Sequence, residues 1–313
     1  MASLKRSSPS FFAIRWFTVF GFLAIFACQS SPKAEAVSTP SDSITVTTTP
    51  ATFEVTLSTT RPVDGALVRL GLRALTEVKA KSVKVSFEGK EFPVFPGSTE
   101  KEQSALIVIP FNSKPRSTKI DLEWEGGRSE FPIEVVDGNY PSEKLTVDEK
   151  KVNPPKRVMA RIRREQKEIG ALYHNVVNER YWSGAFALPI ESEITSNFGN
   201  KRLYNGKMAS FHQGLDLRAR TPLPIRAPEG AKVVMAKDLY YTGNTVILDH
   251  GFGLFTIYAH MSRLDVRVGD RVNKSQVLGL SGGTGRASGP HLHWGAVLLR
   301  EKFNPSDLTR VPR

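Results

Sequence analysis

Short runs of β-branched and aromatic residues, separated by turn-forming residues, fill most of this 313-residue chain and limit what it can fold into. The runs form two blocks, residues 44–136 and 187–313. Runs of this length bounded by Gly, Pro, Asn or Asp are typical of antiparallel sheets. In the first block they cover residues 44–47, 53–57, 66–72, 82–87, 105–109, 118–124 and 131–136, with a hairpin turn between residues 87 and 92. Seven or eight strands in one block of this size predict an immunoglobulin-like β-sandwich, although the Cys–Trp–Cys pattern of true immunoglobulin domains is absent.

One stretch between the blocks has the period of a helix. It follows Pro154 and Pro155, and Pro is common where helices begin. Its apolar residues recur at helical spacing, and its other face is largely basic. The apolar stripe consists of Val158, Ile162, Ile169, Leu172, Tyr173 and Val176. We therefore expect residues 137–186 to hold a Gly-, Pro- and charge-rich linker, residues 137–155, and a connecting basic helix.

The second block again has strand-length runs with Gly and Pro between them, at residues 195–198, 214–217, 232–236, 245–249, 254–259 and 292–298. The expected fold is mostly β. It has an N-terminal immunoglobulin-like β-sandwich at 44–136, the connecting basic helix, and a C-terminal antiparallel β domain at 187–313.

The N-terminus has the pattern of an export signal. Lys5 and Arg6 precede an apolar run at residues 16–27, which is shorter than the roughly 20 residues of a membrane-spanning helix. An amphipathic anchor or an uncleaved span is the alternative. Residues 29–43, rich in Ser, Thr, Pro and Ala, predict a flexible tether.

Cys28 is the only cysteine, so a disulfide within the chain is excluded. Residues 25–28 resemble a bacterial lipobox, with Phe26 as a departure. The resemblance implies that residues 1–28 hold a signal peptide with its lipobox, and that cleavage leaves a lipidated Cys28 as the mature N-terminus. A rival cleavage site follows Ala36. Gln29 after the cysteine implies, by the same resemblance, retention at the outer membrane of a two-membrane cell.

The formal net charge of +12 favours an anionic partner: nucleic acid, a membrane surface or an acidic polymer such as the cell wall. The export signal argues against nucleic acid, and the aromatic and base-reading motifs of nucleic-acid modules are missing. We therefore interpret the basic side of the helix as a solvated face.

Four of the six histidines lie in short motifs in the second block, which points to a metal site with catalytic histidines beside it. His212 and Asp216 form H-x-x-x-D, and Gly214 between them favours a loop running into a strand. His291 and His293 share one face of a strand, because side chains at i and i+2 do so. A catalytic zinc ion needs three protein ligands and one open position, and the spacing leaves open which of His291 and His293 is a ligand.

The metal would polarise a carbonyl and activate water, while histidines near neutral pKa handle protons and the oxyanion. Amide hydrolysis uses all of these parts. The two remaining histidines, His174 on the helix and His250 at a strand end, lack spaced partners and are expected to be structural or at the surface. The Gly-rich stretch 281–289 lacks the Lys of a phosphate-binding loop and is interpreted as a mobile wall of the substrate groove.

Residues 188–304 resemble the lysostaphin/LytM-type zinc endopeptidases, also called the beta-lytic metallopeptidase family. The matching stretches are residues 195–199, 212–216, 221–228, 258–262 and 285–294, with Arg220 replacing a usual Gly. The resemblance implies an antiparallel β fold with a groove over one zinc ion per chain. It implies His212, Asp216 and His293 as zinc ligands, and His260 and His291 as catalytic residues.

The resulting hypothesis is a zinc metalloendopeptidase that hydrolyses peptide cross-links of bacterial peptidoglycan at the periplasmic face of the outer membrane. The alternative is a catalytically silent relative that activates a separate cell-wall amidase. The resemblance does not reach the first block, which is expected to act as a spacer or steric gate, or else as a binding module. The sequence leaves open which bond is cleaved and whether the upstream domain blocks the groove.

Overall fold

The computed structural model describes residues 43–48, 51–76, 83–206, 208–220 and 222–310. The predicted signal peptide, the lipidation site Cys28 and residues 29–42 of the predicted tether lie outside this range. The described residues belong to one compact unit, Ser41–Arg313. None of the described helices combines the length and hydrophobicity that a membrane crossing requires.

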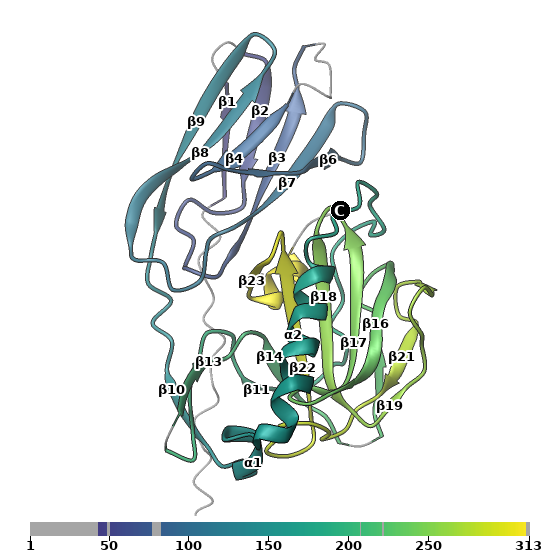
Figure 1. Cartoon of the computed structure of the whole chain (residues 1–313). Helices are drawn as coiled ribbons and strands as arrows, with labels where there is room; N and C mark the ends of the chain where they lie inside the picture. Colours follow the sequence, from purple (N-terminus) through teal and green to yellow (C-terminus); the bar gives the residue numbers. More distant parts are fainter. Residues whose placement is uncertain (1–42, 49–50, 77–82, 207, 221, 311–313) are drawn as a thin grey trace, which may run out of the picture. The chain divides into compact units, whose positions relative to one another are not determined.

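Two antiparallel sheets form the N-terminal part (Figure 1). The first has the order β1-β2-β3-β7-β6, and the second has the order β5-β4-β8-β9. The strands of the first sheet are β1 (Ile44–Thr47), β2 (Phe53–Leu57), β3 (Leu67–Ala74), β6 (Val94–Pro96) and β7 (Glu102–Val108). Those of the second are β4 (Lys84–Phe87), β5 (Lys90–Phe92), β8 (Arg116–Trp124) and β9 (Gly127–Val135).

Buried and exposed residues alternate along strands of both sheets, so that each sheet has one face that packs into the core and one that faces solvent. In β9 the residues Phe131, Ile133 and Val135 are buried and those between them are exposed, as expected when successive side chains point to opposite faces. The order β2-β3-β7-β6 beside β5-β4-β8-β9 is the A-B-E-D and C′-C-F-G order of immunoglobulin domains. The immunoglobulin-like type stays a prediction that this order supports.

The connecting segment contains more structure than the predicted linker and helix. Strand β10 (Ser142–Leu145) pairs with β12 in parallel. The short helix α1 (Glu149–Val152) follows, capped by the Asp148 carboxylate, which accepts a hydrogen bond from the backbone N–H of Lys150. The 3-10 turn η2 (Lys156–Val158) then leads into α2 (Met159–Leu172). Part of the connecting segment, β10, therefore belongs to a sheet of the C-terminal part.

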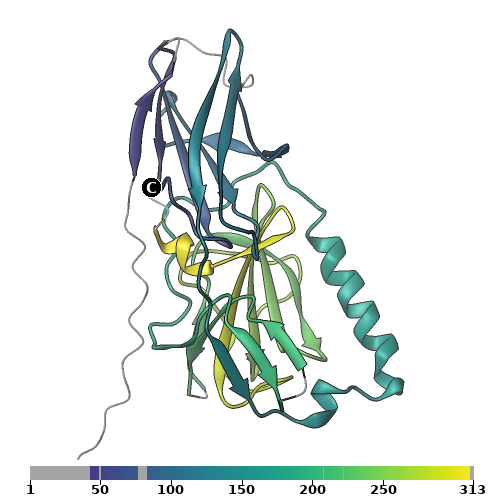
Figure 2. The same cartoon turned by 90° about the vertical axis from the view of Figure 1, so that its left-hand side faces the viewer.

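Helix α2 lies beside the large C-terminal sheet (Figure 2). At its end Tyr173 is buried and its ring lies 5.3 Å from that of Phe255. Ile169 and Leu172 pack against the same cluster, so the predicted apolar stripe does face the core. Val176, beyond the end of the helix, is 40% exposed, and for this residue the predicted stripe is wrong.

The C-terminal part is built on an eight-stranded sheet with the order β11-β14-β22-β18-β17-β16-β20, in which β23 also pairs with β22. Its strands are β11 (Ile194–Ser196), β14 (Leu215–Arg218), β16 (Ala231–Leu239), β17 (Gly243–Gly251), β18 (Leu254–Met261), β20 (Arg271–Val272), β22 (His291–Leu298) and β23 (Glu301–Phe303). Two three-stranded sheets accompany it, β10-β12-β13 and β15-β21-β19. Their remaining strands are β12 (Lys201–Tyr204), β13 (Met208–Phe211), β15 (Pro224–Arg226), β19 (Arg263–Leu264) and β21 (Val277–Leu280), and the 3-10 helix η3 (Pro305–Arg310) ends the described chain.

The mostly-β fold class predicted from the sequence is confirmed. One continuous core cluster contains buried residues from both parts, including Phe95 of β6 and Trp182 ahead of the large sheet. Their rings meet edge to face at 5.3 Å. The central strands β14, β22 and β18 lie side by side, and this arrangement sets the positions of the motif histidines.

Candidate metal centre

The register of two central strands brings two of the motif residues, Asp216 and His293, together. In the antiparallel pair β14–β22, Asp216 lies directly opposite His293. His212 is in the loop that precedes β14, as expected from the sequence. Gly214 lets this loop pass close to β22, since a Cβ there would lie 2.5 Å from the carbonyl oxygen of Trp294. A glycine is therefore required between the two residues of the H-x-x-x-D motif.

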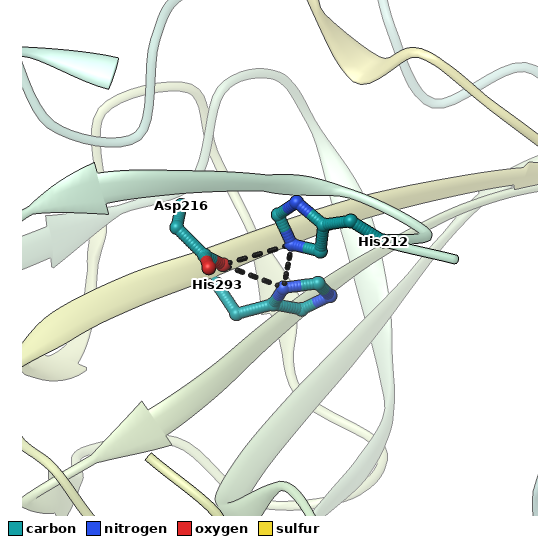
Figure 3. Close-up of side chains that lie close together, drawn as sticks. All are labelled: His212, Asp216 and His293. Carbon is teal, nitrogen blue, oxygen red and sulfur yellow. Dashed lines mark hydrogen bonds and ion pairs between the residues drawn. The ribbon is translucent and has the colours of Figure 1, made fainter. Parts of the chain in front are cut away.

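The side chains of His212, Asp216 and His293 point toward one another (Figure 3). His212 Nε2 is 3.0 Å from Asp216 Oδ1 and 3.0 Å from His293 Nδ1, and the third separation, His293 Nδ1 to Asp216 Oδ1, is 2.9 Å. Ligands of a tetrahedral zinc ion lie about 3.3 Å apart, given bonds of about 2.0–2.1 Å. Two imidazoles and one carboxylate therefore fit a catalytic zinc ion in both chemistry and spacing.

Hydrogen bonds set which nitrogen of His212 faces this cluster. The ring is almost fully buried, and its Nδ1 lies 2.8 Å from the carbonyl oxygen of Asn197 and 3.0 Å from Ser196 Oγ. Because a carbonyl can only accept, Nδ1 carries the proton and Nε2 is left with a free lone pair. Such outer contacts fix the tautomer of metal-binding histidines.

Asp216 is held as a carboxylate. Burial alone would raise its pKa, but hydrogen bonds and charge interactions with His212 and His293 hold the pKa of Asp216 well below its usual value. Arg202 donates a hydrogen bond to the other carboxylate oxygen, Oδ2, so that Oδ1 faces the two imidazoles. Burial lowers the pKa of His293 to about 4. The ring is therefore neutral near pH 7.

His260 and His291 lie against each other beside the ligand triangle. Their ring centroids are 4.7 Å apart, and His291 Nε2 is 3.7 Å from Asp216 Oδ1. In both residues Nδ1 donates to a backbone carbonyl at 2.8 Å, that of Thr284 for His260 and that of Gly289 for His291. Both Nε2 atoms are thus proton acceptors while the rings are neutral.

The backbone of His260 is strained, with φ of 63°, a value that non-glycine residues seldom adopt and that is common at functional sites. Burial, and then the neighbouring His291 and His293, lower the pKa of His260 to about 3. This imidazole therefore stays neutral over the whole physiological range of pH.

The Gly-rich segment predicted as a groove wall supplies both of these carbonyls. The side chain of Thr284 fastens it to the sheet: its Oγ1 donates to the carbonyl of Met261 at 2.8 Å and accepts from the backbone N–H of Asn244 at 2.9 Å. This role of Thr284 was not predicted from the sequence, because a backbone carbonyl carries no residue-type signal.

The two histidines predicted to be structural or at the surface lie away from the cluster. His250 is fully buried, where its Nδ1 donates to the carbonyl of Gly230, and burial lowers its pKa to about 4. His174 is exposed near the end of α2, with its Nδ1 2.7 Å from the carbonyl of Gly170. The structure thus brings five predicted site residues together, and the sixth, Cys28, lies outside the described range.

Three residues that contact the candidate ligands were given no role from the sequence: Ser196, Asn197 and Arg202. The first two lie in a stretch, residues 195–199, that carries the family resemblance, so the signal was present without a role attached. Glu143, which contacts Ser196 and Arg202, lies in the predicted linker, where the sequence has no signal for it.

An antiparallel β domain with a His–Asp–His cluster and two adjacent histidines has the design of a metallopeptidase domain. Residues 210–305 match the model of peptidase family M23. Peptidoglycan DD-endopeptidase ShyA of Vibrio cholerae is 37% identical over 119 residues, which are 37% of this chain and 28% of that protein. Peptidoglycan DD-endopeptidase ShyC of the same organism is 37% identical over 114 residues, 36% of this chain and 26% of the relative. The chain thus matches less than a third of the length of these relatives.

A solved structure described as a putative peptidase M23 from Pseudomonas aeruginosa has a TM-score of 0.61 and 27% identity, covering 79% of this chain and 95% of that one. The chain therefore contains a peptidase family M23 domain at residues 210–305. The lysostaphin/LytM-type resemblance predicted from the sequence is confirmed.

Proposed function

We propose that this protein is an exported zinc endopeptidase that hydrolyses peptide cross-links of bacterial peptidoglycan. The observation that carries the proposal is the convergence of His212, Asp216 and His293 on one point, with His260 and His291 beside it. The names of the relatives, peptidoglycan DD-endopeptidases, support the choice of substrate class.

In this proposal His212 Nε2, Asp216 Oδ1 and His293 Nδ1 hold one zinc ion. A zinc ion in such a site acts as a Lewis acid on a carbonyl and lowers the pKa of water. Asp216 contributes the negative charge and both imidazoles are neutral ligands. Arg202 and the carbonyl of Asn197 keep the ligand atoms turned inward.

His291 is the proposed general base. Its side chain is 14% exposed, so solvent reaches it, and its Nε2 lies 3.7 Å from a ligand oxygen. It can accept the proton of the attacking water and return it to the leaving nitrogen. His260, with its Nδ1 committed to Thr284, is the proposed partner that hydrogen-bonds the reacting groups through Nε2.

The cellular setting remains part of the proposal. We place the protein in the periplasm, lipid-anchored through Cys28 at the outer membrane, with peptidoglycan and the membrane as its partners and no role in nucleic-acid binding. The net charge of +12 suits an anionic wall. We also keep the division into a sandwich at 44–136, a connecting segment at 137–186 and a peptidase domain at 187–313.

The test is digestion of purified sacculi by the full chain, with mass spectrometry of the released products. Wild type should release peptides cut at a cross-link. Asp216→Ala and His293→Ala should lose both zinc and cleavage, whereas His291→Ala should lose cleavage and keep zinc. His174→Ala, an exposed histidine outside the cluster, is the matched control and should behave as wild type.

Unchanged cleavage by Asp216→Ala would refute the metal mechanism. A wild-type protein that binds zinc but releases no peptide would refute the enzyme and favour the amidase-activating alternative. A co-incubation with a cell-wall amidase, scored for released glycan-free peptides, measures that alternative directly.

A further inference from the structure

A strand from the connecting segment runs behind the ligand cluster. Strand β10 precedes the region matched by the M23 family model, residues 210–305, and joins the C-terminal part by pairing with β12. In that pair Glu143 is in register with Arg202. The backbone N–H of Lys201 donates to the carbonyl of Pro141 and that of Asn205 to the carbonyl of Leu145, so both ends of β10 are fixed.

The Glu143 carboxylate contacts three side chains at the back of the cluster. Its Oε2 accepts a hydrogen bond from Ser196 Oγ at 2.9 Å and lies 3.5 Å from Arg202 Nε. Its Oε1 accepts a hydrogen bond from the side-chain amide of Asn200. Both carboxylate oxygens of Glu143 therefore have partners on β11, β12 and the turn between them.

Two of these partners touch metal-ligand candidates directly. Arg202 Nη2 donates to Ser196 Oγ at 2.9 Å and to Asp216 Oδ2, and Ser196 Oγ lies 3.0 Å from His212 Nδ1. Glu143 thus reaches both Asp216 and His212 through one intermediate residue each. The exposed fractions of the side chains fall inward along the path, from 22% for Glu143 to 12% for Arg202 and 8% for Asp216.

The formal charges of these residues explain why Glu143 would matter to a bound cation. Arg202 places a buried guanidinium on a carboxylate that would also bind a divalent cation, and like charges in a low-dielectric interior repel strongly. With Asp216 and Arg202 alone, the nearby formal charges cancel. Glu143 adds a negative charge on the far side of the guanidinium. Asp216, Arg202 and Glu143 together then carry a formal charge of −1, which attracts a cation.

Packing holds the connecting segment in this place. Tyr140, two residues before β10, lies so close to Gly199 that a Cβ there would be 2.2 Å from Tyr140 Cδ1, and Gly199 has φ of +84°. The Tyr140 hydroxyl donates to the carbonyl of Asp64 in the N-terminal part. Tyr140 therefore anchors the segment, just ahead of the strand that carries Glu143, to both the N-terminal and the C-terminal part.

We propose that Glu143 is a positioning residue of the metal centre, acting through Arg202 and Ser196 to orient Asp216 and His212 and to offset the charge of the guanidinium. The inference rests on the proposed function only for the identity of the ion. It assigns a part of the site to a strand that lies outside the region matched by the family model.

The test compares zinc affinity of full-length variants by competition with a fluorescent chelator, using the metal alone and no wall substrate. Glu143→Gln keeps the shape and removes the charge. It should weaken zinc binding by about 10-fold, the lower end of the effect of losing a direct outer contact of a metal ligand, because Glu143 acts through one intermediate residue. Glu143→Asp keeps the charge on a shorter arm and should lie between Glu143→Gln and wild type. Lys144→Gln, exposed on the same strand, is the matched control and should bind zinc as wild type does.

A melting curve of each metal-free variant separates positioning from folding. Positioning predicts that Glu143→Gln melts close to Lys144→Gln without metal but gains less stability from added zinc. Equal zinc affinity of Glu143→Gln and Lys144→Gln overturns the inference, whether or not the protein cleaves peptidoglycan. If Glu143→Gln fails to fold, the zinc affinity of Glu143→Asp decides: a loss supports the inference and wild-type affinity overturns it. Inactivity of a zinc-binding wild type would overturn the proposed function alone.

Discussion

Asp307 should make the stability of this protein depend on pH in an unusual direction. Its carboxylate Oδ2 accepts a hydrogen bond from the backbone N–H of Leu67 at 3.0 Å, and Arg310 lies 3.7 Å from Oδ1. Burial raises the pKa of Asp307 from 3.8 to about 6 despite these two contacts. The folded protein therefore binds this proton more tightly than the unfolded chain does.

The direction and size of the pH effect on stability follow from that difference in proton affinity. A folded-state pKa above the unfolded one gives stability that is fully present below pH 3.8 and is lost as pH rises through about 6. A rise from 3.8 to about 6 is worth about 3 kcal/mol, since each tenfold change in proton affinity is about 1.4 kcal/mol. The side chain is 16% exposed, so solvent screening makes this an upper bound.

Asp307→Asn removes the titration and keeps an oxygen that can accept from Leu67. We expect the variant to match wild type at pH 4 and to exceed it by up to about 3 kcal/mol at pH 8. The assay is urea unfolding of both proteins, followed by tryptophan fluorescence at pH 4, 5, 6, 7 and 8. Asp307→Glu, which keeps a titrating carboxylate, is the control. A difference between Asp307→Asn and wild type that stays constant from pH 4 to 8 would refute the reasoning.

Three further outcomes follow from the site and the core. Gly285→Ala should lower cleavage and leave zinc binding intact. Gly285 has φ of +77°, and a Cβ there would lie 2.3 Å from the backbone nitrogen of Gly243, so the substitution should displace the carbonyl of Thr284. Measuring kcat and zinc affinity on one preparation checks this, and loss of zinc would contradict it. Removing the metal with a chelator should lower the melting temperature, and zinc added back to 100 times its Kd should raise the free energy of unfolding by about 2.7 kcal/mol. Calorimetry with and without chelator measures this. An unchanged melting temperature would argue against a metal site. Trp182→Ala should destabilise the fold by about 3–5 kcal/mol, because Trp182 is 5% exposed and packs on Phe95. Urea unfolding measures the loss of stability. A smaller loss would show that the core does not depend on this ring.

Patterned strands and clustered histidines were predictable from the sequence because each leaves a signal in residue type. Residues 44–47 and 53–57 were predicted with the bounds that β1 and β2 have, since apolar and polar residues alternate there or turn residues flank them. The clustering of the candidate residues was predictable because few residue types bind zinc. His291 and His293 illustrate the limit, since spacing placed both at the site and only the family resemblance gave each a different expected role.

Strand β10 shows what the sequence could not provide. Its residues are charged or polar apart from Leu145, and none is buried, so nothing in its composition distinguishes it from a linker. It becomes a strand only because β12, more than 50 residues later, offers a free edge. The role of Thr284 was hidden for a different reason, because it acts on His260 through a backbone atom.

The continuous core has a consequence for how the molecule comes apart. Phe95, Trp182 and Phe252 pack edge to face or at a tilt, with ring centroids 5.3–6.3 Å apart, and they join apolar residues from both halves. Neither half can lose its structure without exposing these rings to water. We therefore expect a single cooperative melting transition and no stable proteolytic fragment that consists of residues 187–313 alone. Such a fragment would also lack Glu143, the residue proposed to position Asp216 and His212 from outside the region that matches the family model.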